Sequence, residues 1–567
     1  MEKYTMKQLI NIKTIMPAVL LLVLLWVTGC SNEFLNVTPK DTYTEDNYWA
    51  TDAAVRAATN PLYSRAWFGF NDRAMLGLGD ARANDFFNQY FMADYTRFQT
   101  TSLTHEVATS WSSLYAVINI ANSVIYGVQN KCTPKVTQAA KNQALGEAYL
   151  MRATAYFYGV RIWGPMILTE NNNDLVTHPI RPLNPEEDVF KFIIRDLRKA
   201  IELFPPMVGN DPNGYANIWS AKAMLAKVLL AHSGWGKATR DEAELAECVS
   251  ICEDVIDNSG AKLINYEDLF KYQNNINDET MLALRWVVSP TMHWGDCNTQ
   301  ISDLAFQAST DISAWAGDNC PTIDMIDLYN KDKLTHDAIR RKATFFIPGE
   351  HYSYIWSEKG GYDYPIAADS TGELRVKKGV VGTRADNDGN LAQQNSPLHT
   401  ILLRFADVLL THAEASLGNK AELTGGRGLE SFNRVRARAG VSLKDKITWQ
   451  DVMDERRIEF CCEHQAWFEM MTWYRWKPEF MMNYFNNVQK RGYGFGGNSF
   501  RMNADGSISW NVGNGATWDT FDGFNKPDFI PVKIDETNVW IPYPEADVLQ
   551  NPYLAQPPVP YDFGDNK

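Results

Sequence analysis

Segments with helical periodicity, arranged in pairs, restrict the fold of this chain more than any other feature of its sequence. Apolar side chains recur every three or four residues within 139–162, 189–201 and 218–232, which places them on one face of an α-helix. Within 139–162 small residues mix with aromatic ones, so that a second helix can approach closely. Helices of this kind bury their apolar faces mainly against each other, and the sequence therefore predicts an all-α scaffold of helical hairpins.

The hairpins resemble tetratricopeptide (TPR) units, although their spacing is irregular, and we expect this TPR-like region to span 51–257. From 258 to 397 the sequence is rich in Gly, Asn, Asp, Tyr and Trp, which predicts an inserted, irregular, loop-rich region. Helical patterns return over 398–480, and the remaining segment, 481–567, is predicted to be irregular and to pack on the scaffold. The helices expected in the third region are 401–417, 428–439 and 449–473.

The first 29 residues have the pattern of a lipoprotein signal peptide. Three lysines precede an apolar run over 15–27, which as a helix would cover about 20 Å and is too short to span a hydrocarbon core of about 30 Å. The run ends in Val27-Thr28-Gly29-Cys30, which is similar to a lipobox. We expect lipid on the Cys30 thiol and a tether over 30–50; an ordinary secretory peptide with a chance cysteine is the alternative.

The net charge and the aromatic content of the chain indicate which class of molecule it binds. A net charge of −14 argues against nucleic acid and against an anionic membrane face. The 18 Trp and 25 Tyr are numerous, and many lie beside Gly, Asn and Asp; an aromatic ring matches the C–H face of a sugar, while Asn, Asp and Arg can bond its hydroxyls. Most aromatic residues simply fill a core, and we expect this of four on helical stripes: Trp67, Trp111, Trp163 and Trp467.

No motif of catalysis or metal binding is present in the sequence. It has no nucleophile elbow, no Gly-rich phosphate loop and no H-E-x-x-H, and its cysteines lack metal-ligand spacing. We expect no catalytic residue, no metal and no cofactor. A pair of distant glycosidase carboxylates, a bridge between Cys297 and Cys320, and calcium bound among the Asp/Asn loops remain open.

A dense charged block occupies 454–463. Glu455, Glu459 and Glu463 share one face of a helix, and five arginines are interleaved or lie just upstream: Arg434, Arg436, Arg438, Arg456 and Arg457. Ion pairs between two packed helices explain this pattern better than acid/base catalysis or a metal site.

Several motifs resemble, in order, those of the SusD/RagB family. They are Phe34-Leu35-Asn36-Val37-Thr38-Pro39, Asn47-Tyr48-Trp49, Gly146-Glu147-Ala148, Arg152-Ala153-x-x-Tyr156-Phe157, Arg404-Phe405-Ala406-Asp407, Asn433-x-Val435-Arg436-x-Arg438, Asp454-Glu455-Arg456-Arg457-x-Glu459-Phe460 and Trp540-Ile541-Pro542-Tyr543-Pro544. Together these motifs extend over nearly the whole chain that follows the signal peptide.

The resemblance implies a function as well as a fold. Members are all-α, TPR-containing lipoproteins of the outer membrane that capture polysaccharide fragments at the cell surface. They cover a SusC-like TonB-dependent barrel, help to deliver the ligand into it, and perform no bond chemistry. We therefore expect non-catalytic binding of an oligosaccharide or polysaccharide and transfer to such a transporter. The alternatives are capture of peptides for a similar transporter and, as a third possibility, a surface glycoside hydrolase.

The resemblance also implies that loops between the first helices contribute to the ligand site. In this chain the first such loop includes Asp80, Arg82 and Asp85, whose polar groups are expected to bond sugar hydroxyls. Phe86 and Phe87 follow directly and are expected to supply a surface on which a sugar ring stacks.

The inserted region is expected to supply the rest of the site. Trp294 and Trp315 are the preferred stacking residues, because small or polar neighbours surround both, and Asp296 and Asn298 lie between them. A third loop, 352–356, contributes Tyr354. The type of glycan stays open at this stage.

Overall fold

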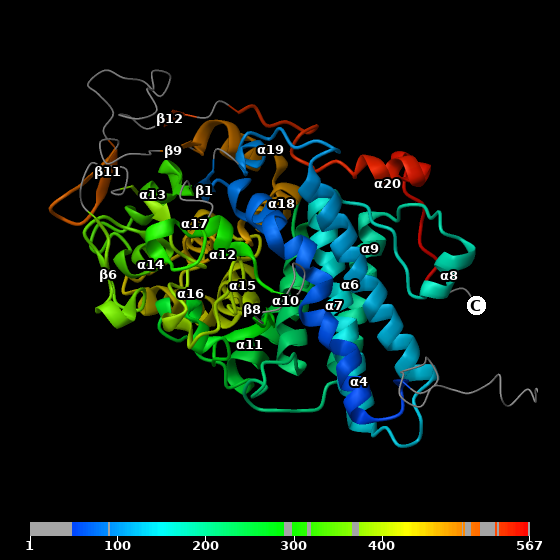
Figure 1. Ribbon diagram of the computed structural model, residues 1–567. Helices are drawn as coiled ribbons and strands as arrows, with labels where there is room; N and C mark the ends of the chain where they lie inside the picture. Colours follow the sequence, from blue (N-terminus) through cyan, green and yellow to red (C-terminus); the bar gives the residue numbers. More distant parts are fainter. Residues whose placement is uncertain are drawn as a thin grey trace, which may run out of the picture.

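The computed structural model describes residues 48–88, 91–288, 297–314, 319–365, 373–489, 491–493, 500–510, 528–529 and 532–564. Helices dominate this part of the chain, and the strands form only two-stranded pairs (Figure 1). The all-α fold expected from the sequence is confirmed.

The scaffold is a row of helices in which each member packs on the next (Figure 1). In packing order they are α6 (His105–Asn130), α7 (Gln138–Trp163), α9 (Glu186–Leu203), α10 (Ile218–Gly234), α11 (Glu242–Asn258), α15 (Phe405–Leu417) and α16 (Gly426–Ala439). The short helix α4 (Asp52–Thr59) lies against α6 and α7. The row therefore continues from α11 to α15 across the inserted region that separates them in sequence.

Side-chain caps define where the first hairpin helices begin. The Thr51 hydroxyl accepts a hydrogen bond of 3.2 Å from the Ala54 N–H at the start of α4. Thr137 does the same for the Ala140 N–H at the start of α7, also at 3.2 Å. Each cap satisfies a backbone donor that the first helical turn leaves without a partner.

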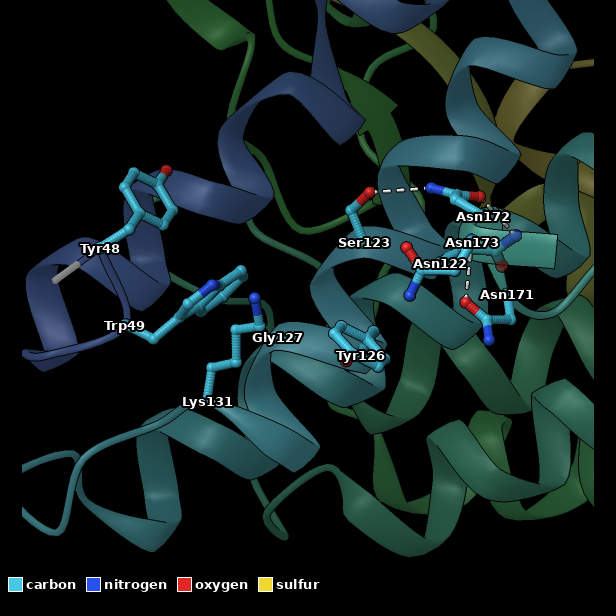
Figure 2. A pocket seen from close by; sticks show the side chains of 10 residues that line it. All are labelled: Tyr48, Trp49, Asn122, Ser123, Tyr126, Gly127, Lys131, Asn171, Asn172 and Asn173. Atoms are coloured by element: carbon cyan, nitrogen blue, oxygen red, sulfur yellow. Dashed lines mark hydrogen bonds between the residues drawn. The ribbon is translucent and has the colours of Figure 1, made fainter. Parts of the chain in front are cut away.

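A hollow of about 350 Å³ opens beside the C-terminal half of α6 (Figure 2). Tyr48 and Trp49 form one side, Tyr126 of α6 and the C-cap residue Lys131 lie beneath, and Asn171–Asn173 form the other side. Asn171 caps the short helix α8 (Asn172–Thr177), and Asn172 and Asn173 are its first two residues. We call this feature the α6 hollow.

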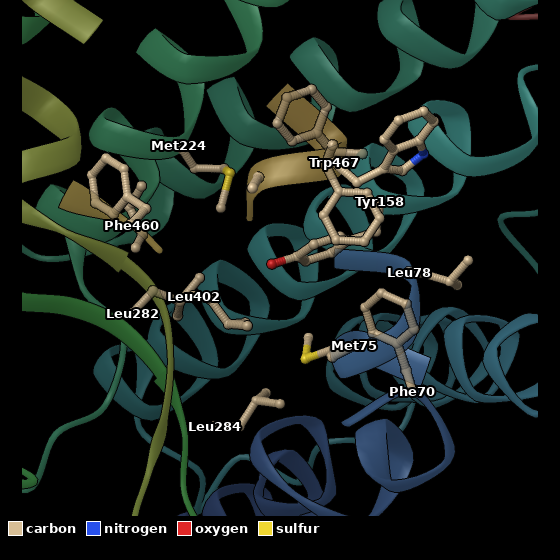
Figure 3. Packing of buried hydrophobic residues seen from close by; sticks show 14 of the residues in the cluster. Phe70, Met75, Leu78, Tyr158, Met224, Leu282, Leu284, Leu402, Phe460 and Trp467 are labelled. Carbon is tan, nitrogen blue, oxygen red and sulfur yellow. The ribbon is translucent and has the colours of Figure 1, made fainter. Parts of the chain in front are cut away.

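The hydrophobic core joins the helical row to the inserted region. Figure 3 shows Phe70, Tyr158 and Trp467 packed together, with Leu284 and Leu402 of a strand pair nearby. Tyr158 stands edge-on to Phe70, with ring centroids 5.1 Å apart. The four tryptophans expected in the core are all buried: Trp67, Trp111, Trp163 and Trp467.

The inserted region holds short elements only. Its helices are α12 (Gln300–Leu304), α13 (Ile323–Tyr329) and α14 (Ala338–Thr344). Its antiparallel pairs are β2 (Thr280–Leu284) with β8 (Thr400–Arg404), β1 (Phe86–Phe87) with β3 (Cys320–Pro321), β4 (Phe345–Phe346) with β7 (Arg375–Val376), and β5 (His351–Tyr352) with β6 (Tyr362–Asp363). The β1–β3 pair is important for the site, because it fastens the insertion to the first helices.

One expected helix begins later than predicted. The segment 401–417 was expected to be helical throughout, but it starts as β8, and α15 begins only at Phe405. Pairing with β2 imposes the extended backbone, and the Phe405 N–H donates to the Glu279 carbonyl at 2.8 Å. Tertiary pairing thus overrides the helical pattern at this point.

A second expected helix is broken in two. Instead of one helix over 449–473, α17 (Trp449–Glu459) and α18 (Ala466–Trp476) flank a turn over 460–465. Cys462 and His464 have φ of 57° and 63° there, in the left-handed region. Tyr266 donates to the Glu459 carbonyl at 2.6 Å, and Lys378 donates to the Cys461 carbonyl at 2.6 Å. These contacts from the insertion occupy the carbonyl groups that a continuous helix would use.

The charged block of α17 forms buried ion pairs, as predicted. Arg436 and Arg438 of α16 pair with Glu455 and Glu459 of α17. Arg404 joins them from β8, with its Nη1 atom 2.6 Å from Glu459 Oε1. Burial alone would raise the pKa of Glu459, but the guanidinium groups of Arg438, Arg404 and Arg340 lower it to about 2.

The C-terminal segment runs over the scaffold between short elements. These are α19 (Pro478–Asn483), α20 (Glu545–Gln550) and the hairpin of β10 (Phe500–Met502) and β11 (Ile508–Trp510), with a further pair of β9 (Gly492–Tyr493) and β12 (Asp528–Phe529). The Tyr543 hydroxyl donates to the Pro165 carbonyl at 2.8 Å, and the Val559 N–H donates to the Leu183 carbonyl at 2.7 Å. The segment thereby covers the ends of α7 and α9.

Candidate functional site

The polar residues of the first loop lie inside the protein. Asp80 is fully buried at the end of η3 (Phe70–Ala81), where its carboxylate accepts the His464 N–H at 2.8 Å and lies 2.7 Å from His464 Nδ1. Asp85 is also fully buried; it accepts the Cys462 N–H at 3.3 Å, and burial raises its pKa to about 8. Both carboxylates hold the turn between α17 and α18 rather than face solvent.

Arg82 and the two phenylalanines of this loop are buried as well. The Arg82 guanidinium lies 4.0 Å from the ring centroid of Phe98 and donates to the Val539 carbonyl at 3.3 Å. Phe86 and Phe87 form β1, and their side chains are 1% and 0% exposed. We expected this loop to contact ligand. The structure contradicts that expectation, because all five side chains are buried.

The residues expected from the insertion divide into two groups. Trp294, Asp296 and Trp315 lie outside the described residues, and their contribution stays a prediction. Asn298 is buried, where its Nδ2 donates to the Leu398 carbonyl at 3.0 Å and its Oδ1 accepts the Gln300 N–H at 3.1 Å. Tyr354 is half-buried, with Lys271 and Lys377 each 4.8 Å from its ring centroid.

An ion pair joins α12 of the inserted region to η3 of the helical scaffold. Arg73 of η3 pairs with Asp303 of α12 through two contacts of 3.2 Å. The same guanidinium lies 4.5 Å from the ring centroid of Phe91, which is 40% exposed. Close by, Asn88 donates to the Asn319 side chain at 2.7 Å. Arg73 and Asn88, on either side of the first loop, therefore contact Asp303 and Asn319, which lie in the inserted region close to Trp294 and Trp315 in the sequence.

The third loop contacts the segment that follows α12 through Trp356. Its indole N–H donates to the Ala308 carbonyl at 2.9 Å, just beyond α12. The Asp386 carboxylate accepts the N–H groups of Trp356 and Ser357, both at 2.8 Å. Trp356 has φ of 55°, an uncommon conformation for a bulky residue, and Lys359 lies 3.4 Å from its ring centroid. The ring is therefore held in place while remaining partly exposed.

Further aromatic rings fill the space between these two anchor points. Phe306 follows α12 and stands edge-on to Phe346, with ring centroids 5.2 Å apart. Tyr362 of β6 lies 6.3 Å from Phe306, and both rings are partly exposed. We define the aromatic face as Arg73, Phe91, Phe306, Trp356 and Tyr362, with Arg73 held by the buried Asp303.

The chemistry of this face is that of a binding surface. Its rings offer C–H/π and hydrophobic contact, and Arg73, which the buried Asp303 holds in place, adds a guanidinium group at its edge. Sequence reasoning includes Trp356 only as part of the third loop, and it misses Arg73 and Phe91. The signal available is Phe91 itself, an aromatic residue shortly after Asn88 and Gln89 and just past β1.

Within the described part of the chain, no group of three or more His, Cys, Asp or Glu side chains is arranged to hold a metal ion. Within the same part, no helix combines the length and apolar character needed to cross a membrane.

Comparisons with known proteins agree with this architecture. A family model described as "SusD family" matches residues 291–559, and one described as "Starch-binding associating with outer membrane" matches residues 34–230. A SusD-like protein of Bacteroides ovatus is 45% identical over 545 residues, which cover 95% of this chain and 96% of that protein.

Solved structures give the same result. A crystal structure with xylogluco-oligosaccharide is 44% identical, covers 90% of this chain and 99% of its own, and has a TM-score of 0.81. A SusD-like carbohydrate-binding protein of Bacteroides fragilis shares the fold at 17% identity, with a TM-score of 0.67 over 90% of this chain and all of that one. These matches confirm the resemblance found in the sequence: the chain belongs to the SusD-like family.

Proposed function

We propose that this protein is a non-catalytic glycan-binding protein whose aromatic face takes up the ligand. The observation that carries the proposal is the meeting of partly exposed rings and an oriented ion pair from three distant segments on one surface. Rings of this kind stack on sugar C–H faces, and the oriented polar groups select the position of hydroxyls. Trp294 and Trp315 extend the same face in this proposal, because Asn319, just beyond Trp315, donates to the Asp303 carbonyl and accepts from Asn88.

The proposed ligand is a plant-type β-glucan such as xyloglucan. The relative solved with xylogluco-oligosaccharide supports this choice, since it matches 90% of this chain at 44% identity. A shared fold alone does not select a glycan: a laminarin-binding SusD-like protein has the same architecture at 18% identity. The ligand is therefore inferred from the relative at 44% identity.

The proposal includes a location and a partner. Cys30 carries a lipid that anchors the chain to the outer membrane, facing the exterior, and captured glycan passes to a SusC-like TonB-dependent transporter. The lipobox-like sequence supports the anchor, and the family description "Starch-binding associating with outer membrane" supports the membrane. Acyl chains on one residue give stable attachment without a spanning helix.

Affinity gel electrophoresis against a polysaccharide panel tests the proposal. Xyloglucan, mixed-linkage β-glucan, laminarin, starch and xylan are compared, using protein without residues 1–30. We expect xyloglucan to retard the wild type, and Trp356→Ala, Trp294→Ala and Trp315→Ala each to weaken binding about tenfold, or about 1.4 kcal/mol. The matched control is Tyr553→Ala, which removes an aromatic side chain of similar exposure at the far C-terminal segment.

Two further readouts separate the alternatives. Unchanged migration across the whole panel, together with binding of oligopeptides, would favour peptide capture. Release of reducing ends from intact polysaccharide by the purified protein would favour a hydrolase.

A further inference from the structure

The α6 hollow has the size and lining of a ligand site, and it lies apart from the aromatic face. Its volume of about 350 Å³ falls in the range of small-molecule sites, about 300–1,000 Å³. Glu106 at the start of α6 lies near Asp72 and Arg73 of the aromatic face region, whereas Tyr126 lies 20 residues further along the helix. At 1.5 Å per residue this places the hollow about 30 Å away.

Two aromatic residues give the hollow an apolar floor and wall. Tyr126 projects from α6 and is 38% exposed (Figure 2). The Trp49 indole lies directly on α6 at Gly127, where a Cβ atom would come within 2.1 Å of the ring. Only glycine permits this approach, so the backbone of α6 is adapted to the indole that forms the wall.

An amide cluster on the opposite side is fixed by its own hydrogen bonds. Asn172 Nδ2 donates to the Asn119 carbonyl at 2.7 Å and to Ser123 Oγ at 2.9 Å. Asn122 donates to Asn172 Oδ1 at 3.1 Å and accepts from the buried Arg152 at 2.6 Å. These bonds hold the chain over Asn171–Asn173 against α6.

Three uncharged polar groups of the hollow are not bonded to other described residues. In the part of the chain that the structure describes, Asn171 Nδ2, the Asn173 side-chain amide and the Tyr126 hydroxyl have no hydrogen-bond partner. Lys131 is the only charged residue in the described lining, with its Nζ 5.7 Å from the Tyr126 ring centroid, and no carboxylate lines the hollow there. A metal ion or a cationic ligand has no counter-charge among these residues.

We propose that the α6 hollow is a second saccharide-binding site. Uncharged amide donors and acceptors facing two aromatic rings match a neutral sugar ring, which offers hydroxyls at its edge and C–H groups on its faces. This inference rests on the proposed function, since it takes the ligand class from there. It adds a second contact point on the scaffold side of the molecule, so that a long glycan can be held at two places and its avidity rises.

Isothermal titration calorimetry tests the second site. Xylogluco-oligosaccharide is titrated into wild type, Tyr126→Ala, Asn173→Ala, Trp356→Ala and the double variant Trp356→Ala/Tyr126→Ala. We expect two sites per molecule in the wild type and one in Tyr126→Ala. We also expect the binding left in Trp356→Ala to fall at least tenfold in the double variant. Gln129→Ala, on α6 outside the hollow, is the control and should bind like the wild type.

The outcomes separate this inference from the function on which it rests. One site that Trp356→Ala alone abolishes would overturn the second site and leave the proposed function standing. The second site is also overturned if Tyr126→Ala and Asn173→Ala both bind like the wild type while their melting temperatures match it. Absence of binding in the wild type across the panel would overturn both.

Discussion

Arg73 and Asp303 form a two-contact ion pair although 230 residues separate them in the sequence. The pair joins η3 of the helical scaffold to α12 of the insertion, and Arg73 at the same time supports the exposed ring of Phe91. Burial outweighs the attraction of Arg73 and raises the pKa of Asp303 to about 6. The ion pair that holds Arg73 at the aromatic face therefore loses the negative charge of Asp303 as the pH falls through about 6.

Replacing Asp303 by asparagine should alter how stability depends on pH. An unfolded aspartate has a pKa of about 3.9, so the folded protein binds the Asp303 proton more tightly than the unfolded chain does. This contribution is present below about pH 4 and is lost as the pH rises through 6, by up to about 3 kcal/mol. We expect the free energy of unfolding of the wild type minus that of Asp303→Asn to fall between pH 4 and 7. Urea denaturation measures it, with the exposed Asp174→Asn as control; a difference independent of pH would contradict the assignment.

Asp80 should prove structural. Because its carboxylate holds the His464 backbone and ring, Asp80→Ala leaves these buried groups without their partner and should cost roughly 1–3 kcal/mol or more of stability. We expect a lower melting temperature with unchanged glycan affinity in the folded fraction, measured by calorimetry and affinity electrophoresis at 20 °C. Loss of affinity without loss of stability would restore Asp80 to the ligand site.

Gly79 is predicted to be indispensable for the close contact between η3 and the turn at His464. A Cβ atom there would come within 2.6 Å of the His464 carbonyl oxygen, a backbone atom that cannot rotate away. Gly79→Ala should therefore destabilise the fold by about 1–3 kcal/mol or more, through overpacking. Gly209→Ala tests a different glycine, which has no neighbour within 4 Å but has φ of 79°. Thermal melting of both variants distinguishes steric crowding from backbone strain, and an unchanged melting temperature in Gly79→Ala would contradict the described contact.

Removing the charge of Glu459 should destabilise the protein strongly near neutral pH. Three arginines surround this buried carboxylate, and Glu459→Gln leaves them short of negative charge, at a cost of about 3–5 kcal/mol. Because the folded pKa lies below the unfolded value, the contribution is complete above about pH 4.5 and is lost as the pH falls through 2. Urea denaturation should show the gap to the wild type closing between pH 5 and 2. Glu422→Gln, which breaks an exposed pair with Lys446, should cost about 1 kcal/mol or less.

Substitution of Cys30 tests the anchor. Cys30→Ser removes the thiol that receives lipid, so the protein should lose incorporation of labelled fatty acid and move from the membrane to the soluble fraction. Cys132→Ser, at a half-buried cysteine of the scaffold, is the control and should remain in the membrane. Retention of Cys30→Ser in the membrane fraction would point to attachment by another route.

The elements that sequence reasoning identifies correctly depend on local information. Helical periodicity locates α7, α9 and α10, and the stripe positions of Trp67 and Trp467 place both rings in the core. The acidic face of α17 with nearby arginines is enough to predict ion pairs. Each of these signals lies within a few turns of one helix.

The elements that sequence reasoning misses depend on distant partners. The turn at 460–465 exists because Asp80, Tyr266 and Lys378 bind its backbone, and β8 is extended because β2 pairs with it. For the same reason, the sequence wrongly predicts that Asp80 faces solvent, because its partner His464 lies hundreds of residues away. The aromatic face could not be predicted for the same reason, because no local sequence pattern indicates the contact between Trp356 and Ala308.

The buried charge network around α17 also sets the order in which this chain can fold. Arg340 and Arg404 precede their acids Glu455 and Glu459, so a growing chain that stops before α17 holds these arginines without most of their counter-charge. A buried arginine without its acid is costly, and contacts of such long sequence separation form slowly. We therefore expect the scaffold and the insertion to reach stability together, and a cut within α17 to unfold both rather than release a tail.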